Sequence, residues 1–484
     1  MKRAIKLLGK DALVYGLAGG ISRFVKVLLV PVVAKAFPAA TYGVFDSLGV
    51  YTYLFAVIGV LGLDAAVILF AKPLPGEPEQ GRRSAASEAL LLVVSVSTGL
   101  ALAIVLARDF WNSLLLGGGP FASAIGWAGA TVPFASVLVF ALSLLKWEFR
   151  QAWYLVASLG SVVASIGLTW IVAYHTPFGL PGLFAATAAG QAVGTVLALA
   201  GCRDLFGPLE GFRWAKPMLR VGIPFAVIGA AAAFTPSIDR FFVLRLHSLA
   251  EAGLYGVGQK IAALMALLMA GFQAAWGPFA VSHRDAPDRD AIFGRVLLLV
   301  AVWGVWLVAV LSLIGPRLAV LAATNEYAGA GRVVPPLALA ATLAAIYFIV
   351  SIGAFLEGRT VLNLVAYAAG ILVTIGLNLA FMVTRTSAMY IAWANCAGQA
   401  AAVALMCVLS HRVLPIAFPY ARAAGVVVMG ALLGTVAAAV APLLKLSTLV
   451  FLLLLTPVAF GMVTWWGILL PAERRALRWR RGSA

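Results

Sequence analysis

The sequence contains 484 residues, of which 63% are hydrophobic and only 11% carry a charged side chain. Soluble globular domains are nearer half apolar and a quarter charged, so this composition excludes a water-soluble enzyme, a disordered chain and a nucleic-acid-binding domain. The formal net charge of +17 would suggest a nucleic-acid partner in a soluble protein, but membrane proteins concentrate Lys and Arg in cytoplasmic loops. The composition therefore predicts a polytopic membrane protein without a nucleic-acid partner.

Apolar runs long enough to cross a membrane follow one another along the chain. A helix needs about 20 apolar residues to cross the hydrocarbon core, and these runs lack the apolar-polar alternation of β-barrel strands. We therefore expect an all-α polytopic protein with about 14 transmembrane helices. The expected spans cover residues 12–34, 43–70, 89–107, 125–145, 153–174, 182–201, 219–238, 252–276, 295–315, 334–357, 360–384, 389–410, 420–442 and 447–470.

The charged residues between these spans indicate how the chain is oriented. With the N-terminus in the cytoplasm, most of the 35 Lys and Arg residues fall in cytoplasmic segments, as the positive-inside rule requires. Both termini are therefore expected to be cytoplasmic. The longest connection, near residues 71–88, is expected to be a solvated hairpin, and no connection is long enough for a separate extramembrane domain. The working part of the protein is expected among the helices.

Neither the cysteines nor the histidines form a pattern of metal ligands. Cys202, Cys396 and Cys407 lie in or beside apolar stretches and form no CxxC motif, which argues against a disulfide framework and against a zinc site. The four histidines are scattered singly along the chain. No Gly-rich phosphate loop or nucleophile elbow is present. We expect no metal and no cofactor.

Two short segments suggest an internal repeat. Residues 39–46 (AATYGVFD) resemble residues 249–256 (LAEAGLYG), with Gly43 aligned on Gly253, although two loops could also be alike by chance. Each segment opens an even-numbered span from the outside, so both copies have the same topology and suggest two parallel six-helix lobes. The expected divisions are an N-terminal lobe at residues 1–202, a C-terminal lobe at 203–412, and two extra helices with a basic cytoplasmic tail at 413–484.

Several short motifs, spread over nearly the whole chain, resemble those of a known family. They are PAATYGVF at 38–45 with LGLDAA at 61–66, KWEFRQAWY at 146–154, LRVGIP at 219–224 with IDRFF at 238–242, and AGLYGVGQKI at 252–261 with WGP at 276–278. In this order they resemble the polysaccharide transporters or oligosaccharide flippases, of the O-antigen flippase type, in the multidrug/oligosaccharidyl-lipid/polysaccharide exporter (MOP) superfamily. The outer loop at 384–388 departs from the family, because it lacks the glycine-rich form common in relatives.

The resemblance implies a MATE-like fold, in which two six-helix lobes surround a central cavity that opens alternately to the two leaflets. It also implies a substrate, an oligosaccharide linked to polyprenyl pyrophosphate, which is flipped from the cytoplasmic to the periplasmic leaflet of a bacterial inner membrane for polysaccharide biosynthesis. Glycan polymerase and glycosyltransferases are the implied partners. Fourteen helices with a cavity of their own could work as a monomer.

Two other functions remain open. A drug/cation antiporter of the same superfamily would be expected to carry acidic residues inside its lobes, whereas the deepest charges here are positive. An integral-membrane glycosyltransferase or polymerase would normally need an acidic or histidine-bearing catalytic loop, and the outer loops offer only isolated acids. We therefore expect a transporter and not an enzyme. The isolated outer acids are Asp109, Glu251 and Glu326.

Three cations lie deep inside the expected spans. Arg23 and Lys26 are three residues apart and share one helix face, at about 17 and 21 Å from the inner surface. Lys260 lies about 12 Å from the outer surface. Each cation exposed to lipid near the centre of a span would cost about 2.5–3.5 kcal/mol, so all three must face water, a counter-ion or a ligand.

We expect these three cations to bind the pyrophosphate or the acidic sugars of the cargo inside the cavity. Arg240, at the outer boundary of its span, is the fourth expected substrate-binding residue if it reaches the cavity mouth; otherwise it snorkels to the membrane interface. The alternative for the deep cations is a structural ion pair. The candidate counter-charges are Asp46 and Asp239 at the outer ends of their spans, and Asp64 at the inner end.

Overall fold

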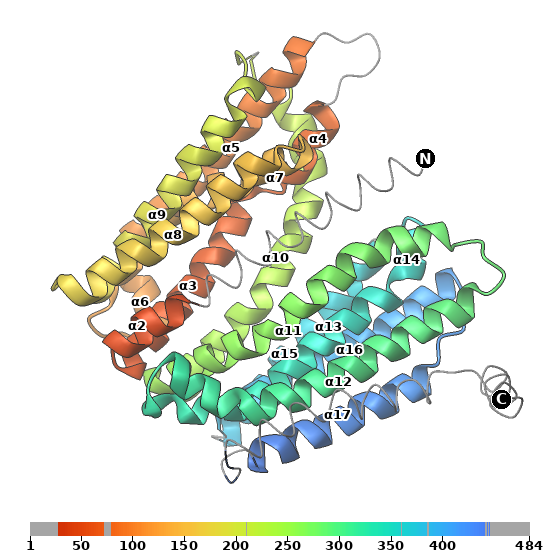
Figure 1. Ribbon diagram of the computed structural model, residues 1–484. Helices are drawn as coiled ribbons and strands as arrows, with labels where there is room; N and C mark the ends of the chain where they lie inside the picture. Colours follow the sequence, from red (N-terminus) through yellow and green to blue (C-terminus); the bar gives the residue numbers. More distant parts are fainter. Residues whose placement is uncertain are drawn as a thin grey trace, which may run out of the picture. The chain divides into compact units, whose positions relative to one another are not determined.

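The computed structural model describes residues 28–71, 79–209, 211–359, 361–384 and 387–440, together with Leu443 and Lys445. Within these ranges the chain is helical and forms no β-strand, which confirms the all-α class (Figure 1). Eleven of the described helical segments are long and apolar enough to cross a membrane. The protein is therefore a multi-pass membrane protein.

The chain divides into two compact units, each assembled from several segments. Unit 1 comprises Met1–Val257, Ala322–Glu326 and Phe381–Ile391, and unit 2 comprises Gly258–Leu321, Tyr327–Ala380 and Ala392–Ala484. The chain thus passes from unit 1 to unit 2 inside one helix, α11 (Leu249–Ser282). The lobes expected at residues 1–202 and 203–412, with two extra helices after them, stay a prediction.

The helices have the following bounds. Those of unit 1 are α2 (Leu29–Ala36), α3 (Ala39–Val60), α4 (Leu63–Ala71), α5 (Glu79–Leu106), α6 (Arg108–Leu116), α7 (Ala122–Trp147), α8 (Gln151–His175), α9 (Gly179–Cys202), the 3-10 helix η1 (Arg203–Leu205) and α10 (Ala215–Leu246). Those after α11 are α12 (Arg289–Ala322), η2 (Asn325–Val333), α13 (Val334–Val350), α14 (Ile352–Leu356), α15 (Val361–Thr384), α16 (Ala388–Val413) and α17 (Tyr420–Val440).

Most helices lie where the apolar runs predict them. Helix α7 covers the span expected at 125–145, and α16 covers the span expected at 389–410. The expected span at 447–470 and most of the one at 12–34 lie outside the described residues. The total of fourteen spans therefore stays a prediction.

The structure differs from the expected spans at two places. Helix α5 begins at Glu79, so part of the hairpin expected at 71–88 is helical. The span expected at 43–70 is interrupted after α3, because Leu61 and Gly62 take left-handed backbone angles with φ of 55° and 65°. At this break the chain lies against α10, where a Cβ on Gly222 would be 2.7 Å from the carbonyl oxygen of Leu61.

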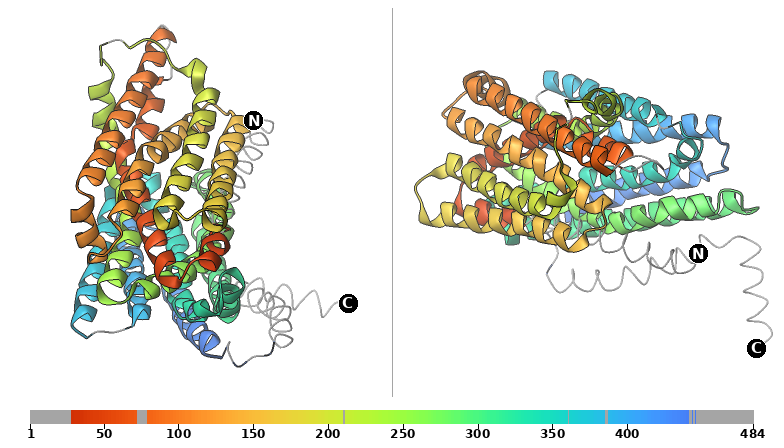
Figure 2. Two further views of the ribbon diagram at one scale, coloured as in Figure 1. Left: turned by 90° about the vertical axis from the view of Figure 1, so that its left-hand side faces the viewer. Right: turned by 90° about the horizontal axis from the view of Figure 1, so that it is seen from above.

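Small residues let helices of unit 1 approach one another closely. Helices α8 and α9 pack side by side, as the views in Figures 1 and 2 show. On α9, a Cβ at Gly190 would overlap the side chain of Ser165, and one at Gly194 would overlap that of Ser161. Such contacts are typical of membrane helices, where close packing replaces the hydrophobic driving force.

A buried apolar cluster fills unit 1 at the end of the helices where α7 finishes. Its fully buried members come from α4, α5, α7, α8, α9 and α10, and include Leu63, Phe140, Leu145, Cys202 and Met218. Cys202, Cys396 and Cys407 are all free thiols, in agreement with the absence of a disulfide framework in the sequence pattern.

Candidate functional site

The structure describes two of the four expected substrate-binding cations, Arg240 and Lys260. Arg23 and Lys26 lie outside the described residues. Lys260 is half-buried on the part of α11 that belongs to unit 2, whereas Arg240 is on α10 in unit 1. The role of all four in binding cargo stays a prediction.

The side chain of Arg240 is buried in an ion pair with Asp46 of α3. The Oδ2 atom of Asp46 accepts hydrogen bonds from Nε of Arg240 at 3.0 Å and from Nη2 at 2.5 Å. The side chains of Arg240 and Asp46 are 0% and 4% exposed, so the pair is shielded from solvent. In this structure the guanidinium is therefore buried against a carboxylate. The pairing joins two positions 194 residues apart in the sequence through charge-assisted hydrogen bonds.

Two further buried side chains complete the polar group around Arg240. The guanidinium carbon lies 4.9 Å from the ring centre of Tyr255 on α11, a cation–π arrangement. The Tyr255 hydroxyl donates a hydrogen bond of 2.9 Å to Oδ2 of Asp239. We call Asp46, Asp239, Arg240 and Tyr255 the polar cluster. It lies near the ends of three helices, where α3 begins, α10 ends and α11 begins.

Beside the polar cluster, the two segments of the suspected repeat contact each other through their aligned glycines. A Cβ on Gly43 would overlap the carbonyl oxygen of Leu249 and lie 2.7 Å from the backbone nitrogen of Gly253. Reciprocally, a Cβ on Gly253 would overlap the carbonyl oxygen of Ala39. The contact thus relates equivalent positions of the two segments, and only residues without a side chain permit it.

A third glycine makes room for the carboxylate of the polar cluster. A Cβ on Gly256 would lie 2.7 Å from Oδ2 of Asp46, the same oxygen that accepts both hydrogen bonds from Arg240. Two turns closer to the start of α3, the backbone N–H of Ala39 donates a hydrogen bond of 3.4 Å to Oε1 of Glu326. The beginning of α3 is therefore held by residues from the second half of the sequence.

The sequence pattern missed the pairing of Asp46 with Arg240, although it carried a signal. Both residues lie near the outer ends of their expected spans, so the sequence predicts a similar depth in the membrane for the two. Equal depth and opposite charge were sufficient to nominate the pair. Whether the two side chains meet depends on how α3 and α10 are rotated about their own axes. The depth of a residue in the membrane does not give that rotation.

At its other end, α10 is held by Glu88 of α5, which the sequence pattern did not single out. Oε2 of Glu88 accepts the backbone N–H groups of Trp214 at 2.8 Å and Ala215 at 3.0 Å. These are among the first N–H groups of α10, which have no partner within their own helix. A carboxylate there also interacts favourably with the helix dipole, so the fully buried Glu88 stabilises the beginning of α10.

Replacing Glu88 with alanine is expected to lower the free energy of unfolding by about 1–3 kcal/mol, because two buried N–H groups lose their acceptor. Replacement with glutamine, which keeps one carbonyl oxygen, is expected to cost less. Thermal unfolding of the purified protein in detergent measures both. Exposed Glu148 provides the control, since Glu148→Gln is expected to leave the midpoint unchanged. Equal midpoints for Glu88→Ala and Glu148→Gln would contradict the capping role.

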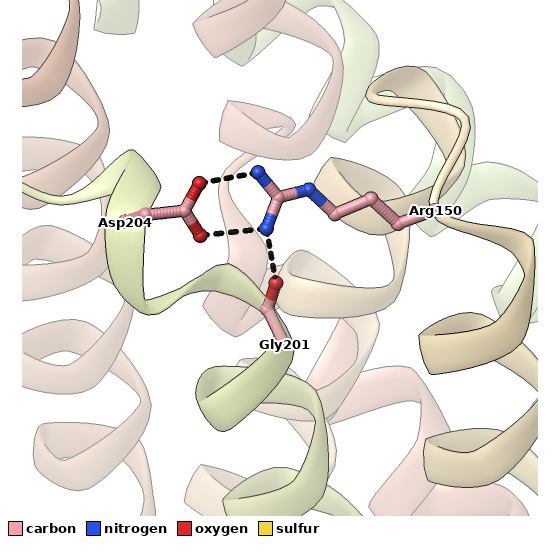
Figure 3. Close-up of polar contacts among 3 residues, drawn as sticks. All are labelled: Arg150, Gly201 and Asp204. Carbon is pink, nitrogen blue, oxygen red and sulfur yellow. Dashed lines mark hydrogen bonds and ion pairs between the residues drawn. The ribbon is translucent and has the colours of Figure 1, made fainter.

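Arg150 ties the beginning of α8 to the end of α9 at the same end of unit 1 (Figure 3). Its Nη1 donates to Oδ1 of Asp204 at 2.6 Å and to the carbonyl oxygen of Gly201 at 2.7 Å, and its Nη2 donates to Oδ2 of Asp204. The hydrogen bonds with Asp204 raise the pKa of Arg150 above its ordinary value. Because both side chains are partly exposed, solvent weakens the pair, and it contributes little to stability.

A small apolar cavity lies in unit 1 between α3, α5, α6 and α7. Its volume is about 20 Å³, which is room for one water molecule. Tyr51, Phe55 and Trp111 line it together with aliphatic side chains. In the part of the chain that the structure describes, no three His, Cys, Asp or Glu side chains come together as metal ligands.

The fold has known counterparts among solved structures. No protein-family model and no curated protein matches the sequence. The lipid II flippase MurJ in an inward closed conformation superposes with a TM-score of 0.73 at 12% identity, over 94% of this chain and 98% of that one. This chain has the fold of a MOP transporter. An inward-facing multidrug resistance MATE transporter of that superfamily gives 0.66 at 17% identity, over 84% and 95%. An outward-facing MATE transporter of the same superfamily superposes with a TM-score of 0.57 at 16% identity, over 87% of this chain and 96% of that one.

Proposed function

We propose that the protein is a flippase that moves an oligosaccharide linked to polyprenyl pyrophosphate from the cytoplasmic to the periplasmic leaflet of a bacterial inner membrane, by alternating access. The observation that carries the proposal is the superposition on the lipid II flippase MurJ, which extends over 94% of this chain. The superposition on the inward-facing multidrug transporter extends over 84% of this chain. Both termini are then cytoplasmic, and glycan polymerase and glycosyltransferases are the partners that would supply or use the cargo.

The deep cations support an anionic cargo. Arg23, Lys26 and Lys260 would bind the pyrophosphate, with arginine acting as a planar fork and lysine as a point charge. Arg240 would join them only where its pair with Asp46 is broken. A cationic drug, the cargo of the alternative antiporter, would be repelled by the same residues. A glycosyltransferase or polymerase has less support, because the matching structures are transporters and a flippase.

The proposal is tested by deleting the gene in the source bacterium and extracting its lipid-linked sugars. Their sidedness is measured with impermeant periodate on intact spheroplasts. We expect a complete oligosaccharide to accumulate in a form protected from periodate, on the cytoplasmic side. Plasmid-borne wild type is expected to restore oxidation, whereas Arg23→Ala at normal protein level is expected to restore it poorly.

The other outcomes separate the alternatives. A truncated intermediate would contradict a flippase and favour a sugar-adding enzyme. Unchanged lipid-linked sugars would favour an exporter of drugs or metabolites. Full rescue by Arg23→Ala would remove that residue from cargo binding and leave the flippase proposal intact.

A further inference from the structure

We propose that the Asp46–Arg240 pair and the Gly43–Gly253 contact together form a latch that opens and closes during transport. The latch holds shut the end of unit 1 where α3 begins, which is the outer end in the orientation proposed above. This inference rests on the proposed function, because alternating access requires that end to open in one state. It assigns to Arg240 a conformational role in place of permanent contact with cargo.

The first argument is where the latch residues come from. Gly43 and Asp46 belong to the first copy of the repeated segment, whereas Gly253 and Gly256 belong to the second. Arg240 is 194 residues from its partner in the sequence. If the two segments belong to the two halves of a transporter, as the repeat suggests, contacts between them break and re-form when one half moves against the other during alternating access.

The second argument is the kind of contact. Gly43 and Gly253 place backbone against backbone, without side chains that interlock. Two such surfaces separate without any side chain having to repack. The ion pair is suited to reversible contact as well, because a buried pair gains little over the same two charges in water. When this end opens, water molecules solvate the carboxylate of Asp46 and the guanidinium of Arg240 in place of their contact with each other.

The third argument is a pair of hydroxyl groups buried next to the ion pair. The Oγ of Ser47 and the phenolic oxygen of Tyr51 have no hydrogen-bond partner among the described residues, although the two residues are only 0% and 7% exposed. They are one helical turn apart on α3, directly after Asp46. Because hydroxyl groups can hydrogen-bond to water, exposing them when this end opens costs less than exposing an apolar surface of the same size.

The latch is tested by the accessibility of a cysteine at the buried position that follows Asp46 on α3. Ser47→Cys is introduced where Cys202, Cys396 and Cys407 are replaced by alanine, and its reaction with a membrane-impermeant maleimide is followed in vesicles. With the latch intact we expect slow labelling. Adding Asp46→Asn, which keeps the side-chain volume but removes the charge that holds Arg240, is expected to speed labelling about tenfold by shifting the population to the open state.

Matched variants separate opening from loss of structure. Asp109→Asn changes an exposed aspartate and is expected to leave the labelling of Ser47→Cys slow. Ala141→Cys, placed instead in the fully buried apolar cluster, is expected to stay unreactive in every background. If Asp46→Asn does not accumulate in the membrane, Gly253→Ala replaces it, since the added Cβ forces α3 and α11 apart while the ion-pair residues are kept.

Each result decides the proposal. Faster labelling at position 47 alone supports the latch. Unchanged labelling at position 47, or equal acceleration at positions 47 and 141, overturns it. The measurement needs no cargo, so it stands whether or not the lipid-linked sugar assay supports a flippase. Comparing right-side-out with inside-out vesicles shows which membrane face the latch closes, independently of whether it opens.

Discussion

Replacing Gly43 with leucine is expected to destabilise the protein by about 3 kcal/mol, at the upper end of the usual cost of overpacking. The reason is that the new side chain would meet backbone atoms, the carbonyl oxygen of Leu249 and the nitrogen of Gly253, and not a movable side chain. Helices α3 and α11 would have to separate near their first turns. Thermal unfolding in detergent and the yield of monodisperse protein measure the effect.

Gly49, on the same helix, is the matched control. It is exposed, and no atom lies within 4 Å of the position where its Cβ would be. Gly49→Leu therefore adds an apolar side chain on the exposed surface of α3 and is expected to leave the unfolding midpoint unchanged or raised. If Gly43→Leu and Gly49→Leu unfolded at the same temperature, α3 and α11 would not be in backbone contact.

Breaking the Asp46–Arg240 pair from one side is expected to cost about 3–5 kcal/mol, because the remaining charge is buried without its partner. Asp46→Ala and Arg240→Met are the single variants. The double variant, which leaves neither charge, is expected to be more stable than the sum of the two single effects predicts. Unfolding of all four proteins of this double-mutant cycle gives the coupling energy.

The more exposed pair of Arg150 and Asp204 provides the comparison. Its side chains are 28% and 53% exposed, so the same cycle there is expected to give a coupling of about 0–1 kcal/mol. Additive effects of Asp46→Ala and Arg240→Met would show that these two residues are not energetically coupled. They would also remove the ion pair from the latch.

How far the sequence predicts this fold is seen at the interruption after α3. The apolar run from residue 43 to 70 correctly indicates one crossing of the membrane, because hydropathy depends only on composition. It does not indicate the left-handed Leu61 and Gly62, since the break depends on the close approach of Gly222 from α10, far along the sequence. The expected hairpin at 71–88 is too long, because α5 already begins at Glu79. Hydropathy does not indicate this start, since a polar helical turn can continue a span beyond the membrane.

The candidate site shows the same division. The resemblance between residues 39–46 and 249–256 suggested equivalent segments, but not that Gly43 and Gly253 would touch each other. Similarity of sequence reports similarity of local structure, whereas contact depends on how the two helices cross. The burial of Arg240 was missed because its depth near a helix end made water or the interface the expected surroundings. In the structure the guanidinium instead contacts the carboxylate of Asp46 on α3.

The long sequence separation of these contacts has a consequence for how the protein is made. At a synthesis rate of about 5–20 residues per second, Asp46 is completed about 10–40 seconds before Arg240, which is 194 residues later. Glu88 is synthesised about 6–25 seconds before Trp214, whose N–H it accepts and which is 126 residues later. During nascent-chain insertion, α3 and α5 thus present acidic groups whose partners do not yet exist. A ribosome stalled before residue 214 would leave a partial bundle in which Asp46 lacks Arg240 and Glu88 lacks the N–H groups of α10.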